Sequence, residues 1–477
     1  MKQFGSVEDA ALVPLVLDVD GSLLLTDLLL ENLWAALRVD LLATLRTVAT
    51  SIRTPARLKQ QLSMIASPDP SLLPVRAAVL DLARQAAMIG RPVLLVSGAD
   101  QVLVDGLAQQ LGLPGPHFGS DGKTNLTGAS KSRLLVSKFG EGGFDYVGNA
   151  AEDLMVWQHA RRCIVVAPGA QMSRRVATLE KPVEVVGSRW KLSSLIAEMR
   201  PHQWAKNLLL LLPLLAAHGG SFQAVLSTML AIAAFCAGAS SLYLVNDMLD
   251  LGDDRQHPEK RSRPLASGAL PLAVGMIASV CLGVSAVLVS WAVAPDVTGL
   301  LVLYMTLSLA YSLSWKQIRW VDLFVLATLY VLRVLTGAAA SNIAVSAWLI
   351  AFCFAVFFTL GIVKRLTALA RATNGGTLPG RGYSAAQLKG LQRLALLTSL
   401  ASAAIFLGYS LGPDAGRLYS SPEILRWATV PIGFWLMRMV ILSRQGREDF
   451  DPMVFVAHDR TGLAIVATGL ALVALSI

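Results

Sequence analysis

Charged side chains are scarce in this sequence of 477 residues, of which 15% are charged and 54% are apolar. Soluble globular proteins carry roughly 25% charged residues. The composition therefore excludes a chain that is soluble along its whole length, and it also excludes a disordered chain. Lysine and arginine number 41 against 32 acidic residues, which gives a net charge of +9. In a membrane protein this excess reports topology, so we expect no nucleic-acid partner.

Cysteine is scarce as well. The four cysteines, at positions 163, 236, 281 and 353, are widely spaced and include no C-x-x-C pair. This spacing predicts neither a disulfide framework nor a zinc site.

Residues 1–199 contain no apolar run of about 18 residues, the rough minimum for a membrane span. Amphipathic stretches such as Val75–Ile89 predict helices, and the segment between Leu24 and Pro74 is mostly helical in pattern. Short, branched apolar runs predict buried parallel strands at Val13–Leu17, Val93–Ser97, Phe144–Val147 and Cys163–Ala167. Strands that alternate with helices predict an α/β domain with a parallel sheet.

Long apolar runs begin near residue 200, and most approach the ~20 residues that cross a bilayer. They lie at 207–217, 222–245, 270–294, 298–314, 321–340, 345–363, 391–410, 425–442 and 461–477. We therefore predict that residues 200–477 form an all-α polytopic membrane domain of about nine transmembrane helices.

Positive charges gather in alternate loops of this membrane part, and the opposite loops have almost no positive charge apart from Arg417. The positive-inside rule places the loops rich in lysine and arginine in the cytoplasm. We expect a multi-pass protein of a bacterial-type cytoplasmic (inner) membrane, with the N-terminal domain and the active sites on the cytoplasmic side.

An acid-rich segment follows the second apolar run. If the helix continues, Asn246, Asp247, Asp250 and Asp254 share one face, because they are three or four residues apart. Converging carboxylates favour Mg²⁺, which prefers oxygen ligands and often brings phosphates with it. Basic residues that could hold those phosphates follow at Lys260, Arg261 and Arg263. The pattern fits loss of a magnesium-bound pyrophosphate from carbon; the alternative is a solvated loop that caps a helix end.

The segment NDMLDLGDDRQHPEKRSRP at 246–264 resembles the first aspartate-rich motif of the UbiA-type prenyltransferase superfamily. Its HPEKRSRPLASG continuation resembles the decaprenyl-phosphate phosphoribosyltransferase branch, which acts in cell-envelope biosynthesis. The resemblance covers residues 200–477, and further matches are RPHQWAKN at 200–207, YSLSWK at 311–316, YVLRVLTGAAA at 330–340 and VKR at 363–365.

This resemblance implies a donor, an acceptor and a direction of transfer. The donor would be phosphoribosyl pyrophosphate, held through Mg²⁺ by Asn246, Asp247, Asp250 and Asp254. The acceptor would be a polyprenyl phosphate, whose oxygen attacks the anomeric carbon while pyrophosphate leaves. The residues implied in phosphate binding are Lys206, Lys260, Arg261, Arg263, Lys316, Lys364 and Arg365. Arg333, a charge inside an apolar run, is a further candidate.

The sequence departs from the superfamily in the loop KQIRWVD at 316–322, which has one acid where most members carry D-x-x-x-D. This argues against prenyl transfer from a prenyl diphosphate to an aromatic acceptor, which stays an alternative. Lys316 and Arg319 could equally be positive-inside anchors. A transporter with a regulatory soluble domain is the non-enzyme alternative, although it leaves the dense acidic and basic motif unexplained.

In the soluble part, Asp18 and Asp20 follow a predicted strand directly, at the edge where open α/β sheets bind ligands. One carboxylate can attack phosphorus while the other protonates the leaving group. Together with Ser97, Lys131 and Asp153, these residues resemble the motifs of the haloacid-dehalogenase (HAD) superfamily of Mg²⁺-dependent phosphatases.

The HAD resemblance implies that Asp18 is the nucleophile and Asp20 the acid/base. It implies that Ser97 and Lys131 bind phosphate, and that Asp18, Asp20 and Asp153 support the metal. The fourth motif usually begins with an acid, whereas this sequence has Asn149. An active phosphatase and a degenerate structural domain therefore both stay open. An active phosphatase could remove the 5-phosphate from the transferase product and so make the chain bifunctional. Prenyl chain length and oligomeric state are not predicted.

Overall fold

The computed structural model describes residues 13–371, 382–445, 455 and 459–477. The chain divides into two compact units, which are treated separately below. The first unit comprises residues 1–199 together with 243–279, and the second comprises residues 200–242 and 280–477. The acid-rich segment at 246–264 therefore packs with the N-terminal part of the chain. The domain boundary at 199/200 stays a prediction.

Six parallel strands form the sheet of the first unit, in the order β3-β2-β1-β4-β5-β6. They are β1 (Leu15–Leu17), β2 (Val93–Asp100), β3 (Phe118–Ser120), β4 (Asp145–Gly148), β5 (Arg162–Val166) and β6 (Val183–Val186). β1 pairs with both β2 and β4, with Leu15 opposite Val93 on one side and Asp145 on the other. The predicted parallel α/β sheet is confirmed, since the four predicted runs correspond to β1, β2, β4 and β5.

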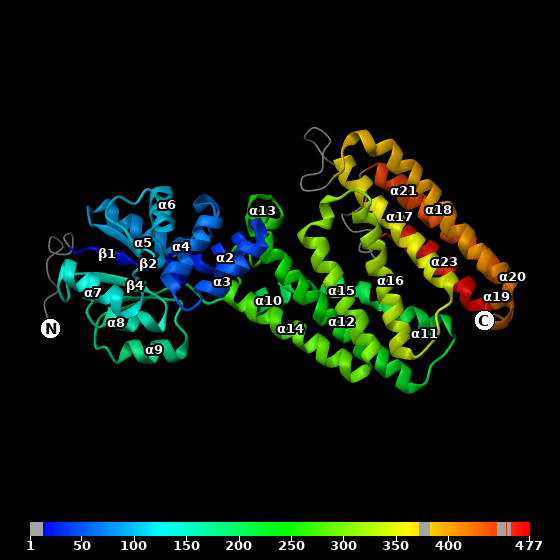
Figure 1. Cartoon of the computed structure of the whole chain (residues 1–477), viewed down its shortest axis with the longest axis horizontal. Coiled ribbons are helices and arrows are strands. Elements are labelled where there is room, and N and C mark those ends of the chain that lie inside the picture. The colour runs from blue at the N-terminus through cyan, green and yellow to red at the C-terminus, as the bar shows by residue number, and fades with distance from the viewer. Residues whose placement is uncertain (1–12, 372–381, 446–454, 456–458) are drawn as a thin grey trace. The chain divides into compact units, whose positions relative to one another are not determined.

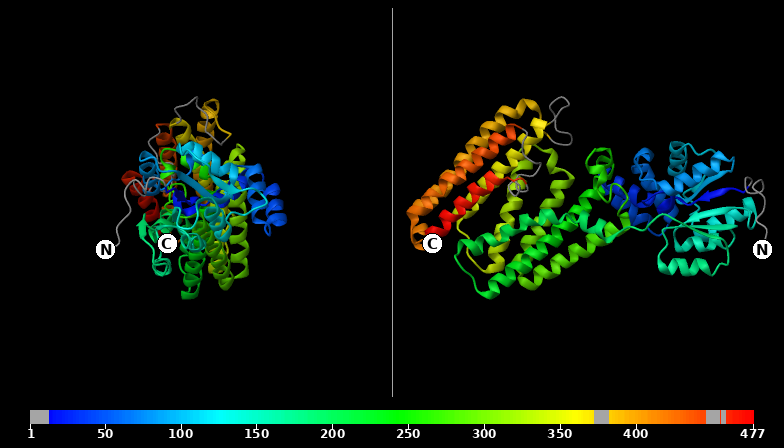
Figure 2. Two further views of the ribbon diagram at one scale, coloured as in Figure 1. Left: turned by 90° about the vertical axis from the view of Figure 1, so that its left-hand side faces the viewer. Right: turned by 180° about the vertical axis from the view of Figure 1, so that it is seen from behind.

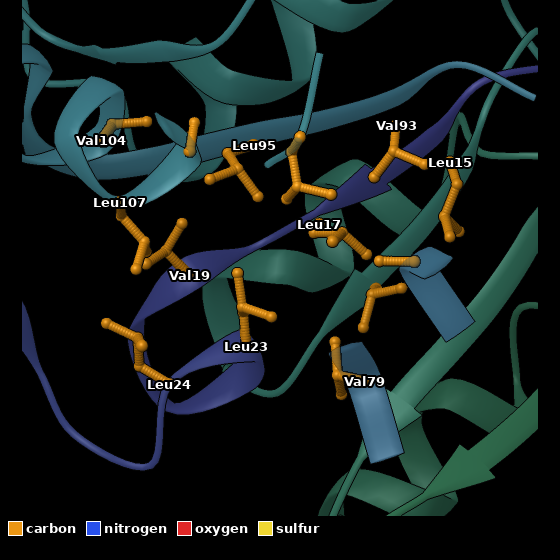
Figure 3. Packing of buried hydrophobic residues seen from close by; sticks show 14 of the residues in the cluster. Leu15, Leu17, Val19, Leu23, Leu24, Val79, Val93, Leu95, Val104 and Leu107 are labelled. Atoms are coloured by element: carbon orange, nitrogen blue, oxygen red, sulfur yellow. The ribbon is translucent and has the colours of Figure 1, made fainter. Parts of the chain in front are cut away.

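Helices cover both faces of this sheet (Figure 1). They are α5 (Ala77–Met88) and α6 (Gln101–Leu111) on one face, and α7 (Gly128–Phe139), α8 (Leu154–Trp157) and α9 (Ala170–Ala177) on the other. On the first face, Leu15 and Leu17 of β1 lie with Val79 of α5 and Leu107 of α6 in one buried cluster (Figure 3). Val16 belongs to the cluster on the opposite face, as the alternation of side chains along a strand requires.

The segment after β1 folds into three helices, α2 (Leu28–Val39), α3 (Leu41–Ser51) and α4 (Pro55–Ile65), which pack on one another. Asp27 caps α2 by accepting from the Leu30 amide, and Asp40 caps α3 by accepting from the Ala43 amide. Such caps satisfy the free amides at a helix start. The predicted helical character of residues 24–74 is confirmed.

The first unit also contains α10 (Leu192–Glu198) and α13 (Leu251–Gln256). Two longer helices, α12 (Phe222–Leu249) and α14 (Leu272–Val293), have one end in each unit.

The rest of the second unit is helical. It contains α11 (Leu212–Ala216), α15 (Pro295–Leu313), α16 (Val321–Ser341), α17 (Ala347–Arg371), α18 (Leu388–Leu411), α19 (Pro413–Leu418), α20 (Pro422–Trp427), α21 (Thr429–Arg444) and α23 (Arg460–Ser476). Figures 1 and 2 show α17, α18, α21 and α23 running side by side, in agreement with their contacts.

Seven helices in the described part of the chain are long and apolar enough to cross a membrane. The final run forms α23, which at 17 residues is shorter. The first run forms a 3-10 stretch, Pro201–Leu211, followed by the short α11. The helical membrane part is confirmed, and the count of nine stays a prediction.

Candidate functional site

The soluble site lies at the point where the strand order reverses. From β1 the chain passes to β2 and β3 on one side, and β4 to β6 lie on the other. In open α/β sheets, ligands bind at the carboxyl ends of the strands beside such a switch point. Asp18 and Asp20 follow β1, and Asn149 and Asp153 follow β4, so the structure brings these residues to one edge. All four line a pocket of about 830 Å³.

Lys131 of α7 forms the shortest contact to the expected nucleophile. Its Nζ donates to Asp18 Oδ1 at 2.6 Å and to the Tyr146 hydroxyl at 3.0 Å, and the lysine side chain is buried. Burial alone would lower the pKa of Lys131, but the charges of Asp18 and Asp153 outweigh it and raise the pKa. Ser22 Oγ donates to the other carboxylate oxygen of Asp18 at 2.8 Å. Asp18 is thus held in a fixed orientation.

The two strand-end aspartates have raised pKa values. Burial, opposed by the charge of Lys131, raises the pKa of Asp18 to about 6. Burial, together with the charges of Asp27 and Asp18, raises the pKa of Asp20 to about 7. Asp20 accepts from the Ser97 hydroxyl at 2.9 Å and from the Leu28 amide at 2.8 Å. A carboxyl group that titrates near neutral pH can both give and take a proton.

The turn that follows Asp20 requires glycine. Gly21 has φ of +71°, and a Cβ there would lie 2.2 Å from Asn149 Nδ2. Asn149 Oδ1 accepts from Ser22 Oγ at 3.3 Å. The loops after β1 and β4 are therefore in direct contact, and the asparagine that departs from the HAD pattern lies inside the site.

Asp153 shapes the loop after β4. Its Oδ2 accepts from the amides of Asn149 and Ala150, both at 2.9 Å, and its Oδ1 accepts from the Tyr146 hydroxyl at 2.7 Å. These bonds give Asp153 a positioning role in the loop. Its expected role in metal support stays a prediction.

The donor set of this pocket fits a magnesium ion. Mg²⁺ is usually held by one or two carboxylates together with substrate phosphates and water. Asp18 and Asp20 supply two carboxylates, and Asn149 supplies an uncharged oxygen. Among the described residues, no group of three or more histidine, cysteine or acidic side chains is placed so that it could hold a metal ion by itself.

Sequence reasoning missed two basic residues of this pocket. Lys59, from α4, donates to the Gly98 carbonyl at 2.5 Å and to Asn125 Oδ1 at 2.9 Å. Arg76 donates to the carbonyls of Gly21 and Ser22, both at 3.1 Å. No motif indicates either residue. The only signal is a basic residue within a helical stretch, for Lys59, or directly before one, for Arg76.

The acid-rich segment forms a compact ionic cluster. α12 ends at Leu249, α13 begins at Leu251, and the Asp254 amide bonds to the Asp250 carbonyl at 2.9 Å. The helical path therefore continues almost without a break, as predicted. Asp247 and Asp254 are buried, and Arg263 Nη1 lies 3.2 Å from Asp247 Oδ1 and 2.6 Å from Asp254 Oδ2. Two expected metal ligands thus share one guanidinium.

One oxygen of this cluster has no hydrogen-bond donor. Asp254 Oδ1 is buried, and among the described residues its nearest recorded cation is Lys260 Nζ at 3.5 Å. Burial raises the pKa of Asp254, although Arg263 opposes the shift. A buried carboxylate oxygen that lacks a donor suits a cation. The two buried carboxylates, Asp247 and Asp254, therefore fit a cation such as Mg²⁺, and metal binding by Asp250 stays a prediction. Asn246 Nδ2 lies 3.4 Å from Asp247 Oδ1, and Arg261 is exposed.

Helix α2 reaches this segment through two arginine–carboxylate contacts. Arg255 forms a two-pronged pair with Glu31, at 2.6 and 3.0 Å, and both side chains are buried. Arg38 bonds Asp253, and its Nη1 lies 3.9 Å from Asp250 Oδ1. The N-terminal part of the chain thus packs directly against the acid-rich segment, which sequence reasoning did not indicate.

The remaining candidates belong to the second unit. Arg365 pairs with the buried Asp322 at 2.6 and 2.7 Å, and Tyr311 donates to the same carboxylate at 2.8 Å. Arg333 donates to Asn207 Oδ1 at 3.0 Å and to the Tyr304 hydroxyl at 2.9 Å. These contacts cross-link helices, and phosphate binding by either arginine stays a prediction.

Three lysines complete the expected set. Lys206, Lys316 and Lys364 are partly exposed and lie in the Pro201–Leu211 stretch, the turn after α15 and α17, respectively. Their roles also stay predictions.

Comparison with known proteins identifies the membrane part. The model of the UbiA prenyltransferase family matches residues 208–457. The uncharacterized protein y4nM of Sinorhizobium fredii is 34% identical over 95% of this chain and 89% of its own length. The nodulation protein NoeC of Azorhizobium caulinodans is 31% identical over 57% of this chain and 89% of its own length.

A third relative has a named activity. Decaprenyl-phosphate phosphoribosyltransferase of Mycobacterium tuberculosis is 36% identical over 33% of this chain and 54% of its own length. The match thus spans about half of that enzyme. Since the family model covers more than half of the sequence, the chain belongs to the UbiA prenyltransferase family. Family membership and the seven apolar helices indicate a multi-pass membrane protein.

Proposed function

We propose that the chain transfers 5-phosphoribose from phosphoribosyl pyrophosphate to a polyprenyl phosphate, with Mg²⁺ as cofactor. The observation that carries the proposal is the cluster of Asp247, Arg263, Asp254 and Lys260, in which carboxylates and cations alternate along a series of ion pairs. Similarity to a decaprenyl-phosphate phosphoribosyltransferase supports this donor and acceptor. We place the site on the cytoplasmic side of the membrane, following the distribution of basic loops.

The transfer balances without an external acid or base. An oxygen of the lipid phosphate forms a bond to the anomeric carbon, while the bond from that carbon to pyrophosphate breaks. The transition state gains positive charge on the sugar and negative charge on the leaving group, so charge neutralisation and alignment supply most of the catalysis. Lys260, Arg261 and Arg263 would bind the leaving pyrophosphate, and Lys206, Lys316, Lys364 and Arg365 the remaining phosphates. The metal, when bound, would neutralise the leaving charge.

The soluble site would then remove the 5-phosphate. Asp18 attacks the phosphorus, the bond from phosphorus to the sugar oxygen breaks, and Asp20 protonates that oxygen. Water hydrolyses the aspartyl phosphate, which yields inorganic phosphate and a lipid that carries ribose. Lys131, which contacts Asp18 at 2.6 Å, would neutralise the phosphate. Fusion in one chain raises the effective concentration of the product at the second site, to about millimolar for a short tether.

One incubation tests both steps. Purified full-length protein is mixed with Mg²⁺, phosphoribosyl pyrophosphate and a polyprenyl phosphate, and the molecular mass of the lipid product is determined by mass spectrometry. Wild-type protein should give a lipid with bare ribose, and Asp18→Asn the same lipid with an added phosphate. Asp250→Asn should give no modified lipid. If Asp18→Asn and wild type give the same product, the phosphatase role is wrong.

A further inference from the structure

The pocket of the soluble site is lined by more basic side chains than the one that contacts Asp18. Lys131 pairs with Asp18, and four further basic residues line the same pocket: Lys59, Arg76, Arg189 and Lys191. The last three, Arg76, Arg189 and Lys191, are called the second basic set below. They come from the start of α5 and from the loop between β6 and α10. The acidic residues of the lining are Asp18, Asp20, Asp27, Glu152 and Asp153.

Arg76 ties the second basic set to the catalytic turn. Its guanidinium donates to the Gly21 and Ser22 carbonyls on one side and to the Ser188 carbonyl, at 3.4 Å, on the other. One planar group thus connects the turn that follows Asp20 with the loop that carries Arg189. Gly187, at φ of +76°, makes room for Arg76, since a Cβ there would lie 3.3 Å from its Nη1. The second basic set therefore lies one loop away from the reacting carboxylates.

No carboxylate neutralises these charges. Within the described part of the chain, Arg76, Arg189 and Lys191 form no ion pair with an acidic residue, whereas Arg162, which lies outside the pocket, pairs with Glu184 at 2.7 Å. Arg189 is exposed, and its guanidinium lies 3.5 Å from where a Cβ of Gly169 would be. Unneutralised guanidinium groups in a pocket bind phosphate oxygens well, because they offer paired donors.

Another part of the pocket lining comes from the segment after the acid-rich motif. Residues 267–269 and 271–273 line the pocket, and Leu272 is the first residue of α14, a candidate membrane span. The pocket thus adjoins the end of a membrane helix. Its volume of about 830 Å³ lies near the upper end of the range for drug-sized ligands, roughly 300–1,000 Å³. A small sugar monophosphate would leave much of it empty.

We propose that the second basic set binds a second phosphate of the substrate, so that the soluble site selects a phosphomonoester that also carries a phosphodiester. This inference rests on the proposed function, in which the substrate is ribose with a 5-phosphate at one end and a lipid phosphodiester at the other. The 5-phosphate lies at Asp18 and Lys131, and the phosphodiester lies at Arg189 and Lys191, with Arg76 between them. The lipid leaves past the residues at the start of α14.

The test compares two soluble probes, ribose 5-phosphate and ribose 1,5-bisphosphate, on the full-length protein. Binding is measured by calorimetry in an Asp18→Asn background, with and without the double substitution Arg189→Gln, Lys191→Gln. Arg175→Gln, an exposed arginine of α9 outside the pocket, is the matched control. We expect the double substitution to weaken binding of the bisphosphate by tenfold or more and that of the monophosphate by less than twofold. The control should change neither value.

Equal losses for the two probes, or no loss for either, would overturn the inference. Turnover of both probes by protein with Asp18 intact separates the inference from the function on which it rests. If the bisphosphate binds selectively but phosphate is not released, the second basic set stands and the phosphatase function fails. If both probes are hydrolysed at equal kcat/KM, with and without the double substitution, the phosphatase function stands and the inference fails.

Discussion

The buried pair between Glu31 and Arg255 gives the sharpest prediction about how the first unit holds together. The two residues are 224 positions apart in the sequence. Glu31 also accepts from the Thr26 hydroxyl at 2.6 Å, and Arg255 Nε donates to the Ala266 carbonyl at 2.9 Å. The exposed fractions of the two side chains are 3% and 6%, so water cannot replace a lost partner. Removing one partner of a buried pair costs about 3–5 kcal/mol, because the other charge stays buried.

Glu31→Gln is the direct perturbation, because it removes the charge and keeps the shape. For a unit of 150–250 residues, each kcal/mol lowers Tm by about 2–4 °C. We therefore expect the unfolding transition of the first unit to fall by about 10 °C. The assay is thermal unfolding of the full-length protein in detergent, followed by tryptophan fluorescence, since Trp34 lies in α2 three residues from Glu31.

A double-mutant cycle isolates the pair. Arg255→Gln should cost a similar amount, and the double variant should be more stable than the sum of the single losses predicts, by about 2 kcal/mol or more. Glu184→Gln breaks a partly exposed pair with Arg162 and should cost less than about 1 kcal/mol. The reasoning is refuted if Glu31→Gln is no worse than Glu184→Gln, or if the losses from the single variants simply add.

Three further changes follow from the geometry. The pKa of Asp20 in the folded protein is about 7, above the ordinary value of 3.8, so ionisation of Asp20 weakens the metal-free fold as pH rises through 7. Asp20→Asn should therefore raise Tm, measured in chelator, more at pH 8 than at pH 5.5. A gain in Tm that does not depend on pH would contradict this. Gly21→Ala should abolish phosphate release and lower Tm, since its Cβ would lie 2.2 Å from Asn149 Nδ2. Normal turnover by this variant would show that the turn after Asp20 accommodates a side chain, which contradicts the prediction. Asp322→Asn leaves Arg365 buried without its anion and should lower the free energy of unfolding by about 3 kcal/mol or more, as measured by thermal unfolding. An unchanged unfolding temperature would show that the ion pair between Asp322 and Arg365 does not stabilise the fold.

Sequence patterns predicted the soluble fold well because its signals are local. The strands β1 and β4 come from short runs rich in apolar residues, and parallel strands must bring their carboxyl ends to one edge. The meeting of Asp18 and Asp20 with Asn149 and Asp153 follows from that rule. The spacing of Asp247, Asp250 and Asp254 likewise depends only on the helical repeat.

Long-range ionic partners could not be predicted in the same way. Glu31 is the one charged residue in the segment LLLENLW, which indicates a buried partner but not which one. The bridge that Arg263 forms between Asp247 and Asp254 is such a contact, and phosphate binding by Arg263 stays a prediction. The pairing of Asp322 with Arg365 depends on how two helices pack, and no single-sequence pattern encodes that contact.

The most direct test of the proposed transferase measures pyrophosphate release from phosphoribosyl pyrophosphate by the full-length protein in Mg²⁺. Release should require a polyprenyl phosphate, should match the amount of ribosylated lipid, and should be lost in Asp247→Asn. Pyrophosphate release from a prenyl diphosphate with an aromatic acceptor, and none from phosphoribosyl pyrophosphate, would contradict the proposal and favour aromatic prenyl transfer.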